Sequence, residues 1–154
     1  MSFRIVPFRP DHAAAWALLN EAWLAEGAFV VEAKNRAVLD DPDGAILRPG
    51  GRIFMAEQGG EAIGCCALIA MDDGGFEVGK MTVTPAARGQ GVSRRLLEAC
   101  EAEARAAGAH RLYLESASSL TVAGALYRSF GFVDLPPRPT PYARADVFME
   151  KRLS

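Results

Sequence analysis

The sequence predicts an α/β fold with one mixed sheet packed between helices, and three observations lead to it. Residues 52–57, 61–71 and 76–83 have strand patterns and are separated by short turns rich in Gly, Asp and Gln. Residues 92–107 then follow a helical period, and residues 110–116 return to a strand pattern. A helix between two strands of one sheet makes a parallel crossover, so hairpins and a parallel pair are expected in the same sheet.

Local patterns support each of these elements. Residues 61–71 are apolar nearly throughout, as expected of a strand covered on both faces. Gly108 is a natural C-terminal cap for the helix before it. One stripe of that helix is apolar and the opposite face carries compensating charges; the stripe consists of Val92, Leu96, Cys100, Ala104 and Ala107.

The other expected elements flank this segment. They are, in chain order, a strand over 3–6, a helix from an N-cap at Asp11 to about Glu26, a short helix over 32–39, a loop over 40–51, a helix over 119–130 ended by Gly131, and a strand over 145–153. The sheet therefore has six or seven strands and helices on both faces.

Composition limits the function classes. The chain has 154 residues and no linker-like run, so a single domain over residues 1–154 is expected. It is 50% hydrophobic with a formal net charge of -2, which disfavours nucleic acid as a partner. No run of about 18 apolar residues is present, so we expect no membrane span and a cytoplasmic protein.

The cysteines carry no metal-site signal. Cys65, Cys66 and Cys100 are odd in number and lack CxxC spacing. Adjacent Cys65 and Cys66 point to opposite faces of a strand. We interpret all three as small core residues and expect no metal ion.

A glycine pair between a strand and a helix is the first candidate site. Gly89 and Gly91 precede the predicted helix, whose first backbone N–H groups have no intrahelical partner and lie at the positive end of the helix dipole. Arg88, Arg94 and Arg95 add positive charge. The pattern fits an anion site, and equally a structural turn with solvated arginines.

This glycine stretch differs from two known phosphate-binding loops, the P-loop and the dinucleotide fingerprint. The P-loop spacing and its lysine are absent. Two of the three glycines of a dinucleotide fingerprint are present, but Arg94 occupies the third position, where a glycine lets helix and strand pack closely. Three hairpin-linked strands also precede the loop. Both observations speak against nicotinamide or flavin binding.

The stretch from Arg88 to Ser93, followed by Leu96 and Leu97, resembles the signature of the GNAT superfamily of acyl-CoA-dependent N-acetyltransferases. A second motif, ALYRSFGF with Tyr127, resembles the strand-helix-strand segment of that family. The resemblance covers about residues 52–134. The last position of the signature is usually Gly or Ala, and here it is Ser93, which is also small.

The resemblance implies acetyl-CoA as the acyl donor and no metal. It implies that the 76–83 strand splays from the 110–116 strand and that pantetheine fills the gap between them. The pyrophosphate would be bound at the glycine loop. The implied cofactor-binding residues are Met81, Thr82, Val83, Arg88, Gly89, Gln90, Gly91, Val92, Ser93, Arg94 and Ser116.

The resemblance also implies two catalytic residues. Tyr127 occupies the position of the family's tyrosine, which stabilises or protonates the departing thiolate, although a core aromatic would also explain it. Glu77 matches the glutamate base of some members, although an edge-strand charge would also explain it. An ordinary carboxylate is a weak base for an amine, so Glu77 needs burial or a relaying water.

Acceptor recognition is expected from the N-terminal helices and the last hairpin, through Trp23, Glu26, Phe29, Glu32 and Tyr142. These residues would form a pocket wall for a cationic group, whereas Arg138 and Arg144 would favour an acidic substrate such as an amino acid. Trp23 and Phe29 are also explained as core residues.

One departure from the family opens an alternative function. Many relatives have asparagine where this chain has Ala117, and Ser116, Ser118 or Ser119 would have to replace it. The sequence thus predicts transfer of an acetyl group to a small-molecule amine or amino acid in a ternary complex. The alternative is a catalytically impaired CoA-binding sensor or interaction module. Family resemblance also suggests a homodimer.

Overall fold

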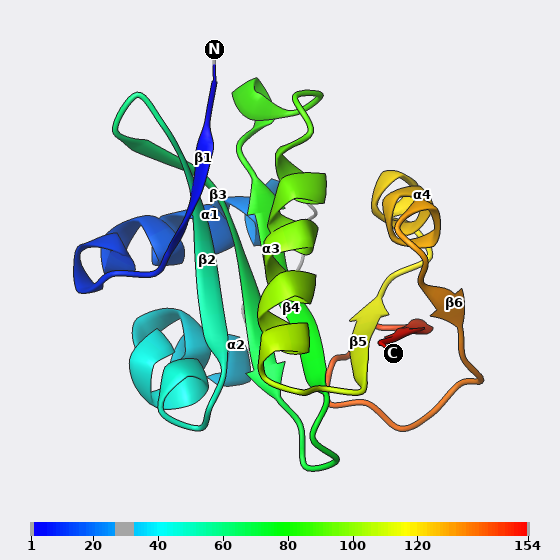
Figure 1. The fold of residues 1–154 in the computed structure, drawn as a ribbon. Coiled ribbons are helices and arrows are strands. Elements are labelled where there is room, and N and C mark those ends of the chain that lie inside the picture. The colour runs from blue at the N-terminus through cyan, green and yellow to red at the C-terminus, as the bar shows by residue number, and fades with distance from the viewer. Residues whose placement is uncertain (1, 27–32, 154) are drawn as a thin grey trace.

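The computed structural model describes residues 2–26 and 33–153, which form one seven-stranded sheet (Figure 1). The strand order is β1-β2-β3-β4-β5-β7-β6, and only the β4–β5 pair is parallel. The strands are β1 (Arg4–Pro7), β2 (Arg52–Gln58), β3 (Glu61–Ala70), β4 (Phe76–Val83), β5 (Arg111–Ser116), β6 (Val133–Asp134) and β7 (Val147–Arg152).

Helices cover both faces of the sheet. The helix α3 lies in front of the strands β1 to β4 in Figure 1, and α1 and α2 lie behind them. The helix α4 follows β5 on the other side of the gap between β4 and β5. The bounds are α1 (Ala13–Glu26), α2 (Ala33–Asp40), α3 (Val92–Ala106) and α4 (Thr121–Ser129).

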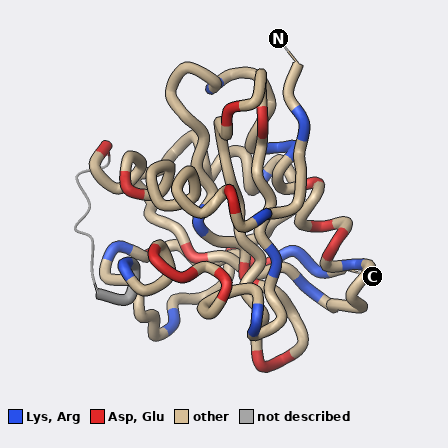
Figure 2. Tube along the Cα trace, turned by 90° about the vertical axis from the view of Figure 1, so that its left-hand side faces the viewer, with Lys and Arg blue, Asp and Glu red and all other residues tan. Residues whose placement is uncertain are grey.

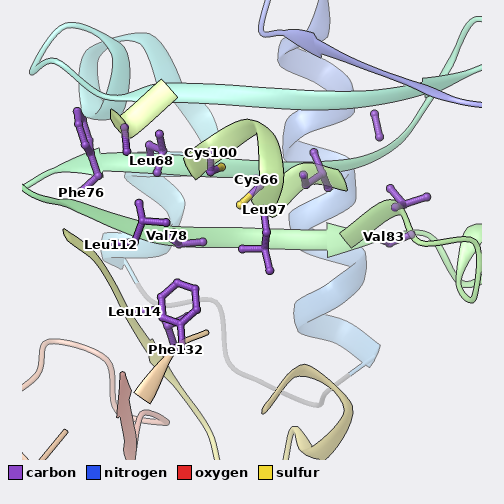
Figure 3. Packing of buried hydrophobic residues seen from close by; sticks show 14 of the residues in the cluster. Cys66, Leu68, Phe76, Val78, Val83, Leu97, Cys100, Leu112, Leu114 and Phe132 are labelled. Carbon is purple, nitrogen blue, oxygen red and sulfur yellow. The ribbon is translucent and has the colours of Figure 1, made fainter. Parts of the chain in front are cut away.

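Alternation along β3 divides the hydrophobic core into two clusters. Cys66 and Leu68 face the cluster beneath α3, which includes Leu97 and Cys100 (Figure 3). Cys65 and Ala67 belong to the cluster on the opposite face, which includes Trp16 of α1 and Ile53 of β2. Strand residues alternate between faces, so an apolar strand such as β3 supports two helix layers at once. The prediction of three core cysteines is confirmed.

The sheet opens at its centre. The parallel pairing of β4 with β5 comprises only Phe76 with Leu112 and Glu77 with Tyr113, and beyond that point the two strands part. The register of β4 against β3 shifts between Cys65 and Ala67. Lys80, opposite this bulge, has a φ of 53°, a left-handed conformation that is unusual for a lysine.

The predicted fold class is confirmed: hairpins, a splayed parallel pair and helices on both faces are all present. Two local expectations were wrong. Asp11 is not the N-cap of α1, because Pro10–His12 form a short 3-10 turn, in which the Nδ1 of His12 accepts the backbone N–H of Arg9 at 2.8 Å. Residues 40–51 are not all loop, because Asp43–Leu47 form a helical turn that buries Ile46.

The sequence did not predict the short strand β6, and it placed the ends of the last strand, β7, too far apart. The strand β6, only two residues long, pairs with β7 and gives the sheet its seventh strand. The final strand runs over Val147–Arg152, shorter than the expected 145–153. The backbone N–H of Asp146, just before this strand, still donates to Ser116 O of β5 at 3.0 Å.

Charges of both signs alternate over the molecule. Figure 2 shows basic and acidic segments intermixed along the trace, without one continuous band of either sign in that view. No helix within residues 2–26 and 33–153 is long and apolar enough to cross a membrane.

Candidate active site

A cleft of about 840 Å³, part of it open to solvent, lies where β4 and β5 part. Small-molecule sites are usually concave and carry a few polar groups, as this cleft does. Its polar and aromatic lining comes from α1, from β4 and β5, from α4, and from the segment before β7. These lining residues are Asn20, Trp23, Glu77, Lys80, Glu115, Ser116, Tyr127, Tyr142 and Arg144.

Glu77 is the titratable group of greatest interest in this cleft. It is half-buried on β4, at the last residue that still pairs with β5. Burial raises the pKa of its carboxyl to about 7, with a further contribution from the negative charge of Glu115, while Lys80 opposes the shift. Sequence reasoning required burial before Glu77 could act as a base, and the structure provides it.

Glu115 is a second carboxylate in the same cleft. Its Oε2 accepts the Tyr113 hydroxyl at 2.8 Å, and its Oε1 accepts the Thr140 hydroxyl. These two hydrogen bonds fix the orientation of the carboxylate. The negative charge of Glu115 is one cause of the raised pKa of Glu77.

Tyr127 reaches the cleft from α4. Its half-buried ring lies edge-on to Phe132, with 5.9 Å between ring centroids. Burial is the main cause that raises the pKa of its hydroxyl well above the ordinary value. Tyr127 is therefore a hydrogen-bond donor throughout the neutral pH range and a poor source of a free proton.

The bulged end of β4 carries the three residues for which main-chain contacts to the cofactor are predicted. Met81 lines the cleft directly. Thr82 and Val83 are buried and pair with Cys65 and Gly64 of β3, so what they offer the cleft side is backbone. The carbonyl of Val83 accepts the Nε of Arg88 at 3.2 Å.

The glycine loop has the geometry expected of an anion cradle. Gly89 and Gly91 both have a φ of 81°, and Gly91 is the N-cap of the fifteen-residue α3. A Cβ at either position would meet no atom within 4 Å, so the glycines are required by backbone conformation and leave the approach open. The amides of Val92 and Ser93 open α3, where N–H groups lack intrahelical partners.

The arginines of this loop have partners within the chain. Arg88 forms a two-point ion pair with Glu26 at the end of α1, at 2.7 and 2.5 Å. Arg94 donates to the Ser129 hydroxyl at 2.6 Å, and the side chain of Gln90 accepts a hydrogen bond from Gln58 at 3.3 Å. The loop therefore rests on several elements distant in sequence.

The predicted acceptor residues divide into three groups. Trp23 and Tyr142 line the cleft. Glu26 is instead paired with Arg88, outside the lining. Phe29 and Glu32 lie outside the described residues.

The segment around Ala117, where many relatives have asparagine, also contributes to the cleft. Ser116 lines it and Ala117 is buried. Ser118 donates both its backbone N–H and its hydroxyl to the carboxylate of Asp146, each at 2.7 Å, so this serine holds the segment before β7.

Sequence reasoning missed three polar residues of the cleft, namely Asn20, Lys80 and Glu115. Asn20 had a detectable signal, because it is a polar residue four positions after Trp16 on the buried side of α1, where its Nδ2 donates to Trp16 O at 2.9 Å. Lys80 and Glu115 had none, since only the bulge and the splayed strands bring them into the cleft.

Among residues 2–26 and 33–153, no three His, Cys, Asp or Glu side chains gather as metal ligands would.

The open sheet and the glycine loop are features of acetyltransferases, and comparison of the chain with known proteins leads to the same class. The chain belongs to the GNAT family of acetyltransferases, since the model of the Acetyltransferase (GNAT) family matches residues 10–132. The recognition made from the two sequence motifs is thereby confirmed.

Two relatives that are more than 30% identical to this chain are named as acetyltransferases. The chain is 42% identical over 113 residues to the IAA acetyltransferase of Azospirillum brasilense, which covers 70% of this chain and 72% of the relative. It is 33% identical over 120 residues to the uncharacterized N-acetyltransferase YjgM of Escherichia coli K12, covering 75% and 72%.

Solved structures show the same fold. An acetyltransferase of the GNAT family from Staphylococcus aureus Mu50 gives a TM-score of 0.90 at 17% identity and covers 99% of this chain and 100% of its own. The yncA protein of Salmonella typhimurium, solved with its cofactor acetyl-CoA, gives 0.77 at 22% identity and covers 100% and 95%. At such identities the likeness concerns the fold alone.

Proposed function

We propose that the chain transfers an acetyl group from acetyl-CoA to the amine of a small-molecule acceptor, by direct attack of the amine on the thioester in a ternary complex. The observation that carries this proposal is that Glu77 of β4 and Tyr127 of α4 line one cleft at the parting of β4 and β5. One group is suited to take a proton from an amine, and the other to stabilise a departing thiolate.

The donor is proposed to bind at two places. The backbone amides from Gly89 to Ser93 would hold the pyrophosphate, supported by the open glycine conformations and the start of α3. The pantetheine arm would lie along β4 as an added strand, hydrogen-bonded to main-chain groups of Met81, Thr82 and Val83. Beyond Glu77 this edge of β4 is not paired with β5, and extended chains add to such edges.

Glu77 is proposed as the base. An amine of lysine type has a pKa of about 10.4 and arrives protonated, so its proton must leave before the nitrogen can attack. The raised pKa of Glu77, about 7 instead of 4.5, makes that transfer less unfavourable by about 3 kcal/mol. The attack forms the new C–N bond, and the C–S bond of the thioester breaks. The second proton of the nitrogen passes to the departing thiolate, which leaves as the CoA thiol.

Tyr127 is proposed to donate a hydrogen bond to the thiolate sulfur as the C–S bond breaks. Its raised pKa keeps the phenol protonated, and a thiol has a pKa of about 8.5, so complete proton transfer is unfavourable. Preorganised dipoles of this kind, together with the backbone of the bulge, are usually the largest catalytic contribution.

The proposal is tested in two steps. Calorimetry measures acetyl-CoA binding, and a screen of small amines and amino acids then measures the release of CoA thiol. Binding together with acceptor-dependent thiol release is the expected result. Binding without release for any acceptor would instead support the CoA-binding sensor or module, and absence of binding would refute both functions.

We also propose that residues 1–154 act as one domain and that the chain forms a homodimer. The support for a dimer is the open sheet, whose edge strands β1 and β6 have neighbours on one side only. Sedimentation equilibrium tests it, and a monomeric mass at micromolar concentration would contradict it.

A further inference from the structure

The cleft carries charges of both signs, and their placement bears on the acceptor. Glu77 and Glu115 contribute two carboxylates from β4 and β5. Lys80 and Arg144 contribute two cations to the same lining. A simple cationic amine complements the carboxylates but leaves the cations facing a ligand of their own sign.

Arg144 is oriented by aromatic rings. Its Cζ lies 5.5 Å from the ring centroid of Trp23 and 5.9 Å from that of Tyr142. Stacking of this kind limits the rotamers of a guanidinium and leaves its plane well defined. Both rings also line the cleft, so Arg144 is held at the site itself.

The backbone that carries Arg144 is anchored on both sides. The N–H of Ala145 donates to Tyr142 O at 3.2 Å, and the N–H of Asp146 donates to Ser116 O at 3.0 Å. The carboxylate of Asp146 further accepts two hydrogen bonds from Ser118. Arg144 thus has a fixed position relative to the end of β5.

Tyr142 lies beside both cations of the cleft. Its ring centroid is 5.8 Å from the Nζ of Lys80 and 5.9 Å from the Cζ of Arg144. Burial raises the pKa of its hydroxyl to about 12, with smaller contributions from the charges of Glu77 and Glu115. Tyr142 therefore contacts both cations and also feels the charges of both carboxylates.

We propose that the acceptor is an amine that also carries a carboxylate, of the amino-acid type, with its ammonium group at Glu77 and its carboxylate bound by Arg144. This inference rests on the proposed acetyl transfer and names its substrate class. A planar guanidinium binds a carboxylate through two parallel hydrogen bonds, which an ammonium or an amide cannot replace. A zwitterion also matches the two charges of each sign in the lining.

The test compares acceptors that differ only in the carboxylate. Each amino acid is assayed beside its carboxamide and its decarboxylated amine, with thiol release as the readout. For the unmodified protein we expect kcat/KM to be about tenfold to a hundredfold higher for the amino acid than for the other two. Arg144→Gln is expected to raise KM for the amino acid by a similar factor, to change kcat less, and to abolish the preference.

Arg138→Gln tests the other arginine that the sequence favoured for an acidic substrate. The Arg138 guanidinium also lies over two aromatic rings, those of Tyr113 at 5.7 Å and Phe148 at 5.9 Å, but Arg138 does not line the cleft. This variant is expected to keep the carboxylate preference. Arg144→Lys, which retains the charge without the planar fork, is expected to recover only part of it.

The outcomes separate this inference from the proposed function. Thiol release that is equally fast with amino acids and with their carboxamides would overturn the inference and leave acetyl transfer standing. An unchanged preference in Arg144→Gln would overturn the role of Arg144. Should no acceptor release thiol, the proposed function fails, and calorimetric titration of the acetyl-CoA complex with amino acid and carboxamide still decides whether Arg144 binds a carboxylate.

Discussion

Replacement of Glu77 by glutamine is expected to change the pH dependence of the reaction. With a pKa of about 7, the Glu77 carboxyl is about nine-tenths ionised at pH 8 and about one-tenth ionised at pH 6. An acceptor with a pKa near 10.4 is almost wholly protonated over that interval. The unmodified protein should therefore show kcat/KM rising about tenfold per pH unit below pH 7 and levelling off above it.

Glu77→Gln should follow a different curve. Without the carboxylate only the neutral amine reacts, about one molecule in a few thousand at pH 7, and that fraction rises about tenfold per unit up to the amine pKa. The plateau should disappear, and kcat/KM at pH 7.5 should fall by about a hundredfold to ten-thousandfold, the range of general-base catalysis. Glutamine keeps the size of the side chain, so the cleft keeps its shape.

The assay is initial-rate thiol release at saturating acetyl-CoA from pH 5.5 to 10, with one acceptor throughout. Glu61→Gln, at the exposed start of β3, is the control and should keep the profile of the unmodified protein. A break near pH 7 that persists in Glu77→Gln, or that is absent from the unmodified protein, would refute the assignment of Glu77 as the base.

Four further predictions concern other parts of the structure. Tyr127→Phe keeps the ring against Phe132 and should lower kcat about tenfold to a hundredfold with little change in acetyl-CoA affinity; unchanged turnover would contradict its role. Gly91→Ala places a side chain at a φ of 81°, which costs about 1–2 kcal/mol, and should weaken acetyl-CoA binding measured by calorimetry without raising KM for the acceptor. His12→Ala removes a buried ring whose Nε2 lies 2.7 Å from Glu57 and should lower Tm by roughly 3 to 8 °C; a smaller shift would mean that the pair contributes little. Since His12 and Arg9 hold the pKa of Glu57 at about 2, its contribution to stability is present above pH 4.5 and should be lost as the pH falls towards 2, and thermal melts of Glu57→Gln should lack that loss.

Local chemistry made some features predictable. Strand patterns separated by glycine turns predicted the hairpins β2–β3 and β3–β4. The middle strand, β3, was recognisable because a strand covered on both faces needs nearly continuous apolar residues. The loop at Gly89 and Gly91 was identifiable because only glycine adopts a positive φ without cost. The bounds that failed, at Asp11 and in residues 40–51, depend on hydrogen bonds and burial that no local pattern reveals.

The candidate site divides in the same way. The sequence by itself determined the glycine loop and the helix it opens, because these follow from backbone conformation and short-range spacing. Tyr127 was indicated by the family resemblance alone. Only the tertiary structure decided that Arg88 is paired with Glu26, that Arg144 faces the cleft, and that burial raises the pKa of Glu77. Charge pairing and desolvation depend on which groups the folded chain brings together, and residues distant in sequence meet only when the sheet has formed.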